Sequence, residues 1–155
     1  MPRRVEYFDD PNAPRANSLV VAVTAVVVND QGELLLQKRT DNDLWGLPGG
    51  AMNTGESIGQ AVIREVKEET SLDVEPTGVV GIYSDPGHII AYADGEVRQE
   101  FSICFSARIA GGLAAVSDQE STEVRFIKPS ALDELPMSRS TRLRIQHFLE
   151  RRATP

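Results

Sequence analysis

The chain has 155 residues, of which 41% are hydrophobic and 25% are charged, and its formal net charge is −7 at pH 7. A chain of this length can bury a core as one domain without disulfides or a structural metal, and its composition is typical of a folded protein. The negative charge argues against a broad basic surface that binds duplex nucleic acid. A small anionic substrate is still compatible with this charge, but it needs a positive partner within its site.

The single cysteine, Cys104, rules out an intramolecular disulfide and a thiolate zinc site. This cysteine usage favours a reducing, cytoplasmic location. The N-terminus carries two arginines without an apolar stretch behind them, so we expect no signal peptide. The longest apolar run, Leu19 to Val28, is shorter than the roughly 20 residues that span a bilayer, so we expect no membrane partner.

The first third of the chain predicts a strand hairpin behind a polar lead-in. Residues 1–17 are polar and carry Pro11 and Pro14, which predicts an irregular N-terminal arm before a folded domain over residues 18–152. The valine-rich segment 19–28 predicts a strand buried on both faces. A turn signal at residues 29–32 then predicts a hairpin partner over residues 33–38.

The clearest helix is predicted over Ser57 to Thr70. Ser57, followed three residues later by Gln60, forms the capping-box pattern of a helix start. Shortly before it, the Pro48-Gly49-Gly50 turn ends any regular element and lets the backbone approach a ligand closely.

The second half of the chain is expected to be mainly extended. Turn signals at Asp85-Pro86-Gly87 and Ala93-Asp94-Gly95 bracket a short predicted strand, His88 to Tyr92, and an earlier strand is predicted over residues 79–83. Residues 100–109 alternate between polar and apolar types, which predicts a half-buried strand with one apolar face and with Cys104 on its polar side.

The C-terminal part completes the predicted architecture. A last strand over residues 123–128 ends at Pro129, and helical segments follow at 130–135 and 139–151, the second with an apolar stripe. Together these elements predict an α/β fold of one domain, an α/β/α sandwich with a mixed β-sheet.

One face of the predicted helix is acidic. Glu65, Glu68 and Glu69 fall within an arc of about 100°. Like charges at these spacings destabilise a helix by about 0.2–0.5 kcal/mol per pair, and the helix dipole disfavours negative charge near the C-terminal end. The helix alone leaves two interpretations open: a solvated acidic face, which is the commoner case, or convergent carboxylates for Mg²⁺ or Mn²⁺.

The sequence around this helix resembles the Nudix box. The pattern runs from Gly50 through five residues to Glu56, then through seven residues to Arg64-Glu65-Val66-Lys67-Glu68-Glu69-Thr70-Ser71-Leu72. Every fixed position of the box matches except the final glycine, which is Ser71 in this chain. Because the flanking elements follow the α/β/α order of the family, the resemblance covers nearly the whole chain and favours the cation site. The family glycine ends the helix in a left-handed conformation, where serine should cost about 1 kcal/mol.

The resemblance implies a hydrolase that depends on a divalent metal, with Mg²⁺ as cofactor and Mn²⁺ as an alternative. Such an enzyme acts as a pyrophosphatase on a small-molecule nucleotide, a nucleoside diphosphate linked to another moiety, with ADP-ribose or a related nucleotide sugar slightly favoured. A nucleoside triphosphate pyrophosphohydrolase that removes oxidised nucleotides is the alternative, and a nucleotide-sensing module without catalysis is a third interpretation. A homodimer is an open possibility by the same analogy.

The resemblance also assigns metal and catalytic residues. The metal ligands are expected to be Glu65, Glu68, Glu69 and the backbone carbonyl of Gly49. Glu65 is either a ligand or the carboxylate that orients the attacking water, and Arg64 holds that carboxylate in place. The catalytic set is Arg64, Glu65, Glu68 and a further carboxylate from a late loop. That loop offers Asp118, Glu120 and Glu123, of which Glu120 is favoured.

Candidates for substrate contact are less well defined. Four residues near the box could contact a base or a phosphate: Arg39, Glu56, Tyr83 and His88. Glu56 is also expected to lie next to the metal ligands and hold them in position, without contacting the metal itself. Instead of contacting substrate, Tyr83 could pack in the core. Arg39 could lie at the edge of the fold and extend its charged group into solvent. Pro86 lies near the position of a proline in ADP-ribose-type relatives, but a simple turn is the favoured interpretation.

Overall fold

The centre of the fold is strand β3 (Ala22–Val28), part of the valine-rich segment. In the computed structural model, which describes residues 4–153, β3 pairs in parallel with β8 (Val97–Gly111) and antiparallel with β6 (Gly49–Ala51). The predicted turn after β3 leads into β4 (Leu34–Arg39), its antiparallel partner. The hairpin prediction is therefore confirmed, and β3 fixes the glycine turn against the middle of the sheet.

Within residues 4–153, nine strands form one mixed sheet whose main path is β1-β7-β8-β3-β4-β5. At one edge β1 (Arg4–Phe8) pairs antiparallel with β7 (Asp73–Tyr92), and β5 (Trp45–Gly46) lies at the other edge. Beside this path β2 (Ser18–Leu19) pairs with β8, and β9 (Ser121–Ile127) pairs with β4. Parallel and antiparallel pairs occur together, which confirms the predicted mixed sheet.

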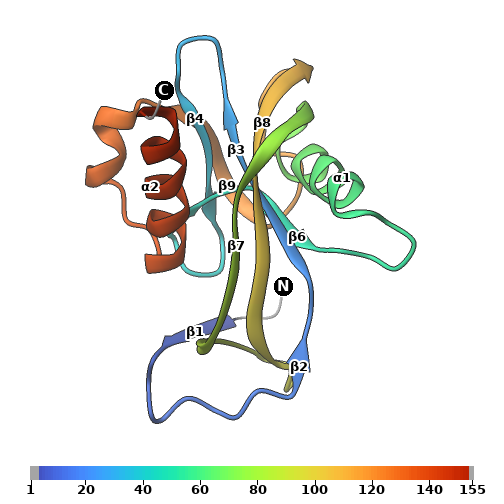
Figure 1. Ribbon diagram of the computed structural model, residues 1–155, viewed down its shortest axis with the longest axis vertical. Coiled ribbons are helices and arrows are strands. Elements are labelled where there is room, and N and C mark those ends of the chain that lie inside the picture. The colour runs from blue at the N-terminus through green and yellow to red at the C-terminus, as the bar shows by residue number, and fades with distance from the viewer. Residues whose placement is uncertain (1–3, 154–155) are drawn as a thin grey trace.

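Helices α1 and α2 cover opposite faces of this sheet (Figure 1). On one face α1 (Ile58–Thr70) packs buried side chains such as Val66 into an apolar cluster with β3. On the other face α2 (Arg139–Ala153) packs Ile145 into a second cluster, and a short 3-10 helix (Pro129–Glu134) precedes it. The predicted α/β/α sandwich is confirmed. None of the helices in the described part of the chain is long and apolar enough to cross a membrane.

The segment expected to be an irregular arm contains strand β1. Its residues pair with His88–Tyr92 of β7, and Pro11 and Pro14 follow the strand rather than interrupt it. The irregular assignment is therefore wrong for residues 4–8, because the sheet edge supplies a hydrogen-bonding partner that a polar composition does not reveal.

Strand β7 does not break at Asp85-Pro86-Gly87, where a turn was predicted. The pairing of β7 with β8 shifts register between Asp85 and Ile89, so the residues between them form a bulge without reversing the chain. The N–H of Gly87 donates to the Asp85 side chain, and its carbonyl accepts from the N–H of Asp9. The strongest local turn signal of this segment thus produces a bend inside one long strand.

Strand β8 is buried on the side that was expected to be polar and exposed. Glu100, Ser102 and Cys104 are all buried because α2 covers them. Arg144 of α2 donates to Glu100 Oε1 at 3.0 Å and to Ser102 Oγ at 2.5 Å. The prediction of a single buried, apolar face is therefore wrong. Alternation of polar and apolar residues cannot show whether the polar face meets solvent or a helix that supplies a polar partner.

Candidate active site

Helix α1 has well-defined ends, and these set the direction of its acidic side chains. The predicted capping box is present: Ser57 Oγ accepts from the N–H of Gln60, and the Gln60 side chain accepts from the N–H of Ser57. At the other end Ser71 has φ 67°, the left-handed conformation expected there, and its N–H donates to the carbonyl of Lys67.

Glu69 is the most deeply held carboxylate of the helix. It is 1% exposed, and its oxygens accept from Gln37 Nε2 at 3.1 Å and from the N–H of Gly49 at 2.8 Å. Burial raises the pKa of Glu69 to about 8; the two hydrogen bonds oppose this, while the charges of Glu65 and Glu120 add to it. A nearby cation would stabilise the ionised form of such a group.

Two further acids come to Glu69 from the loop before β9. Asp118 and Glu120 each bring a carboxylate oxygen to it, and the three ligand atoms all lie within 4.8 Å of one another. Burial, followed by the charge of Asp118, raises the pKa of Glu120. Convergent carboxylate oxygens are the donor set that a hard divalent cation requires, so these residues fit Mg²⁺ or Mn²⁺. Glu123, the third candidate acid, lies in strand β9 and is paired with Arg125 instead.

Arg64 links the other acids of the box. Its guanidinium donates to both oxygens of Glu56, at 2.7 and 3.0 Å, and to the carbonyl of Ala51 at 3.0 Å. It also lies 3.0 Å from Glu65 and 3.2 Å from Glu68. Hydrogen bonding to Arg64 lowers the pKa of Glu56. Because both oxygens of Glu56 bind Arg64, Glu56 is placed to position Arg64 rather than to meet a substrate.

The glycine turn is needed for close approach. A Cβ atom on Gly50 would lie 2.6 Å from the carboxyl carbon of Glu65, and one on Gly49 would collide with the backbone carbonyl of Val23. The turn therefore packs tightly on β3 and leaves room for the Glu65 carboxylate. The N–H of Gly49 binds Glu69, whereas a metal contact of its carbonyl stays a prediction.

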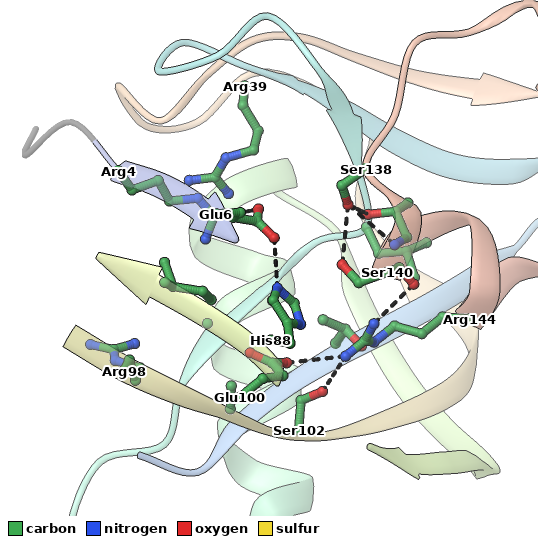
Figure 2. A pocket seen from close by; sticks show the side chains of 18 of the residues that line it. Arg4, Glu6, Arg39, His88, Arg98, Glu100, Ser102, Ser138, Ser140 and Arg144 are labelled. Atoms are coloured by element: carbon green, nitrogen blue, oxygen red, sulfur yellow. Dashed lines mark hydrogen bonds and ion pairs between the residues drawn. The ribbon is translucent and has the colours of Figure 1, made fainter. Parts of the chain in front are cut away.

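A cavity of about 150 Å³ extends from the glycine turn. Figure 2 shows its walls, where polar and charged side chains from β1, β4, β7, β8 and α2 converge. Arg39 and His88 line this cavity. Arg39 forms two 2.9 Å hydrogen bonds with Asp41, and His88 Nε2 lies 2.8 Å from Glu6 Oε2.

Tyr83 lies apart from this cavity, between the sheet and α2. Its hydroxyl forms a 2.8 Å hydrogen bond with His147 Nδ1, and the Arg144 guanidinium lies 4.2 Å from the centre of its ring. Burial raises the pKa of Tyr83. These contacts correspond to the packing alternative for Tyr83.

Several residues of the site carry no signal in the sequence. Gln37 holds Glu69, and a set of charged side chains forms much of the cavity wall: Arg4, Glu6, Arg98, Glu100 and Arg144. Arg4 and Glu6 share one face of β1, and Arg98 and Glu100 share one face of β8, but such short polar pairs do not by themselves mark a site. Only the sheet pairing of β1 with β7 and the packing of α2 on β8 bring them together.

The comparisons with known proteins agree with this fold. The NUDIX domain family matches residues 18–148. The chain is 32% identical over 107 residues to a putative 8-oxo-dGTP diphosphatase of Bacillus subtilis, covering 69% of this chain and 65% of that protein. It is 34% identical over 123 residues to an ADP-ribose pyrophosphatase of Methanocaldococcus jannaschii, covering 74% of this chain and 65% of that protein. A crystal structure of a MutT NUDIX hydrolase from Burkholderia pseudomallei has a TM-score of 0.67 at 27% identity and covers 84% of this chain and 98% of that one.

The chain belongs to the Nudix family. The family match includes the glycine turn, helix α1 and the loop that carries Asp118 and Glu120. The alignments with the two curated relatives span just under two thirds of the length of each relative.

Proposed function

We propose that this protein is a divalent-metal-dependent pyrophosphohydrolase that cleaves the pyrophosphate of a nucleoside diphosphate linked to another moiety. The observation that carries the proposal is the convergence of Glu69, Asp118 and Glu120, with the pKa of Glu69 raised to about 8. Carboxylates that lie this close together repel one another in the free protein, and a divalent cation removes that repulsion.

The metal-binding residues in this proposal are Glu65, Glu68 and Glu69, with the carbonyl of Gly49 and a carboxylate of the late loop. Mg²⁺ bound there, or Mn²⁺ in its place, would supply Lewis-acid polarisation of the phosphoryl oxygens and a more acidic water. Arg64 orients Glu65 through the 3.0 Å contact between them. Glu120 is the late-loop acid that either completes the ligand set or accepts the proton of the water, and its raised pKa suits the second role.

ADP-ribose or a related nucleotide sugar is the substrate class we favour. The relative from Methanocaldococcus jannaschii, named an ADP-ribose pyrophosphatase, supports this choice. A nucleoside triphosphate is the second candidate, because the Bacillus subtilis relative is named a putative 8-oxo-dGTP diphosphatase. We also place the protein in the cytoplasm, and the support is the lone, buried Cys104. The arm at residues 1–17, the domain at 18–152 and a homodimer stay predictions.

A substrate panel with product analysis tests the proposal. ADP-ribose should give AMP and ribose 5-phosphate in the presence of Mg²⁺, whereas hydrolysis of a triphosphate should give a monophosphate and pyrophosphate. The ratio of kcat/KM between the two substrates decides between the two classes. Metal-dependent binding of ADP-ribose without release of AMP would instead support a sensing module.

A further inference from the structure

Gln37 occupies a position on β4 that an apolar side chain would fill well. It follows the fully buried leucines at residues 34–36 and is itself 1% exposed. Its Nε2 donates to Glu69 Oε1 at 3.1 Å, whereas its own Oε1 is buried and has no hydrogen-bond partner among the described residues. Because a buried acceptor without a donor is unfavourable, packing alone does not explain a glutamine at this position.

The orientation of the Gln37 amide satisfies Glu69 and leaves Gln37 itself unsatisfied. If the amide were turned over, Oε1 would face Glu69 Oε1, and two acceptors would meet. The other oxygen of Glu69 accepts from the N–H of Gly49 at 2.8 Å, and Gly49 is fixed by its pairing with Thr24 on β3. With one donor on each oxygen, the Glu69 carboxylate cannot rotate freely about its terminal bond.

The same end of β4 also holds the late loop. Thr40, the residue directly after the strand, donates from its N–H to the carbonyl of Glu120 at 3.0 Å and from its Oγ1 to the same carbonyl at 3.2 Å. Gln37 and Thr40 thus connect β4 to both parts of the carboxylate cluster. The cluster brings ligand atoms of Glu69, Asp118 and Glu120 within 4.8 Å of one another.

We propose that Gln37 is a positioning residue of the metal site, whose Nε2–H fixes the plane of the Glu69 carboxylate so that Glu69 and the late-loop acids face one cation. The identity of the cation and of the reaction rests on the proposed function. Gln37 acts through Glu69 in this role and contacts neither the metal nor the substrate. Groups that orient metal ligands influence the affinity for the metal as well as the rate, and their loss typically costs about 10–100-fold.

Two methionine substitutions on β4 separate this role from simple packing. Gln37→Met keeps a long, unbranched side chain but removes both the donor to Glu69 and the unpartnered acceptor. Leu35→Met is the matched control, because Leu35 lies two residues away on the same face of the strand and packs in the apolar cluster under α1. Exchanges between leucine and methionine are generally well tolerated in a core.

Binding of Mn²⁺ without substrate, measured from the electron paramagnetic resonance signal of the free ion, tests the role in metal binding. We expect the dissociation constant for Mn²⁺ to rise about tenfold in Gln37→Met and to change less than about twofold in Leu35→Met. With a chelator present, the melting temperature of Gln37→Met should equal or exceed that of the wild type, because the substitution removes an unsatisfied acceptor. A residue with only a structural role would lower the melting temperature and leave the affinity unchanged. Should Gln37→Met fail to fold, Gln37→Leu repeats both measurements.

Unchanged affinity for Mn²⁺ in the Gln37 variant would overturn the assignment, and so would failure of both Gln37 variants to fold or an equal loss of affinity in Leu35→Met. A wild-type protein that does not bind Mn²⁺ would contradict both the assignment and the proposed function. Weaker Mn²⁺ binding by Gln37→Met, in a protein that hydrolyses no pyrophosphate, would support the role of Gln37 and contradict the proposed function alone.

Discussion

At the scale of single residues, Ser71 is the one departure from the family box. The structure places it in the left-handed conformation with φ 67°, which a side chain with a Cβ atom adopts at a cost. Ser71→Gly should therefore raise the free energy of unfolding by about 1 kcal/mol and the melting temperature by about 2–4 °C. Thermal denaturation checks this prediction; an unchanged or lower melting temperature would show that the serine conformation carries no strain.

The raised pKa of Glu69 gives metal binding a defined dependence on pH. In the unfolded chain this carboxyl ionises near its ordinary pKa of 4.5, whereas in the folded protein it does so near 8. As the pH rises from about 4.5 to about 8, the unfolded state loses its proton first, so Glu69 progressively destabilises the metal-free protein. Binding of Mg²⁺ requires the ionised form and must displace a proton below about pH 8.

The rise in melting temperature caused by Mg²⁺ should consequently be larger at about pH 8 than at about pH 6. Thermal denaturation at both pH values, with Mg²⁺ and with a chelator, measures the difference. A larger effect of Mg²⁺ at the lower pH contradicts the role assigned to Glu69.

The sequence indicated the acidic residues of the box but not their environment. Glu65, Glu68 and Glu69 share one helix face, as the spacing requires, yet their burial differs: Glu69 is enclosed, whereas the Glu68 side chain is 55% exposed. Sequence periodicity predicts the direction in which each side chain points around a helix. It does not predict which loop of the fold covers part of that helix. For the same reason Asp118 and Glu120 could be named only as members of a loop.

At the scale of elements, the glycine turn and helix α1 form one unit. Gly50→Ala should push the Glu65 carboxylate out of place, because the added Cβ would lie 2.6 Å from the carboxyl carbon. We expect kcat to fall at least about tenfold, since small misplacements of catalytic groups are costly. The backbone of the turn can keep its conformation, so the melting temperature should change little.

Steady-state kinetics and thermal denaturation test this variant together. Gly59→Ala is a suitable control, because a Cβ there meets only Ser57 Oγ, at 4.0 Å. Unchanged kcat in Gly50→Ala would show that Glu65 has freedom to move without loss of function.

The elements that the sequence predicted best have local causes. Helix α1 begins at a capping box and formed where expected, and the dense valine run formed β3 over Ala22–Val28, the later part of the strand expected over residues 19–28. Strands β1 and β7 were misjudged because distant pairing decided them: the N–H of Asp9 binds the carbonyl of Gly87 across the predicted turn. The buried polar side of β8 likewise depends on Arg144, which lies 44 residues beyond its partner Glu100.

At the scale of the whole molecule, the net charge of −7 and an anionic substrate are compatible. Part of the acidity lies in the carboxylates of α1 and the late loop, where Mg²⁺ would reverse the local field. The arginines of the cavity are each paired with an acid, so they do not provide a broad basic surface. Charge arithmetic therefore argues against one class of ligand, but it cannot locate the positive partner of a small one.

The most direct test of the central claim is hydrolysis of ADP-ribose and nucleoside triphosphates, with Mg²⁺, by Glu69→Gln beside Glu123→Gln. Both substitutions remove one acid, but only Glu69 lies in the carboxylate cluster, whereas Glu123 pairs with Arg125 at the surface. For the substrate that the wild type cleaves, we expect kcat/KM of Glu69→Gln to fall at least about 100-fold and that of Glu123→Gln to stay within about twofold. Nearly full activity in a folded Glu69→Gln variant would contradict the metal-dependent mechanism.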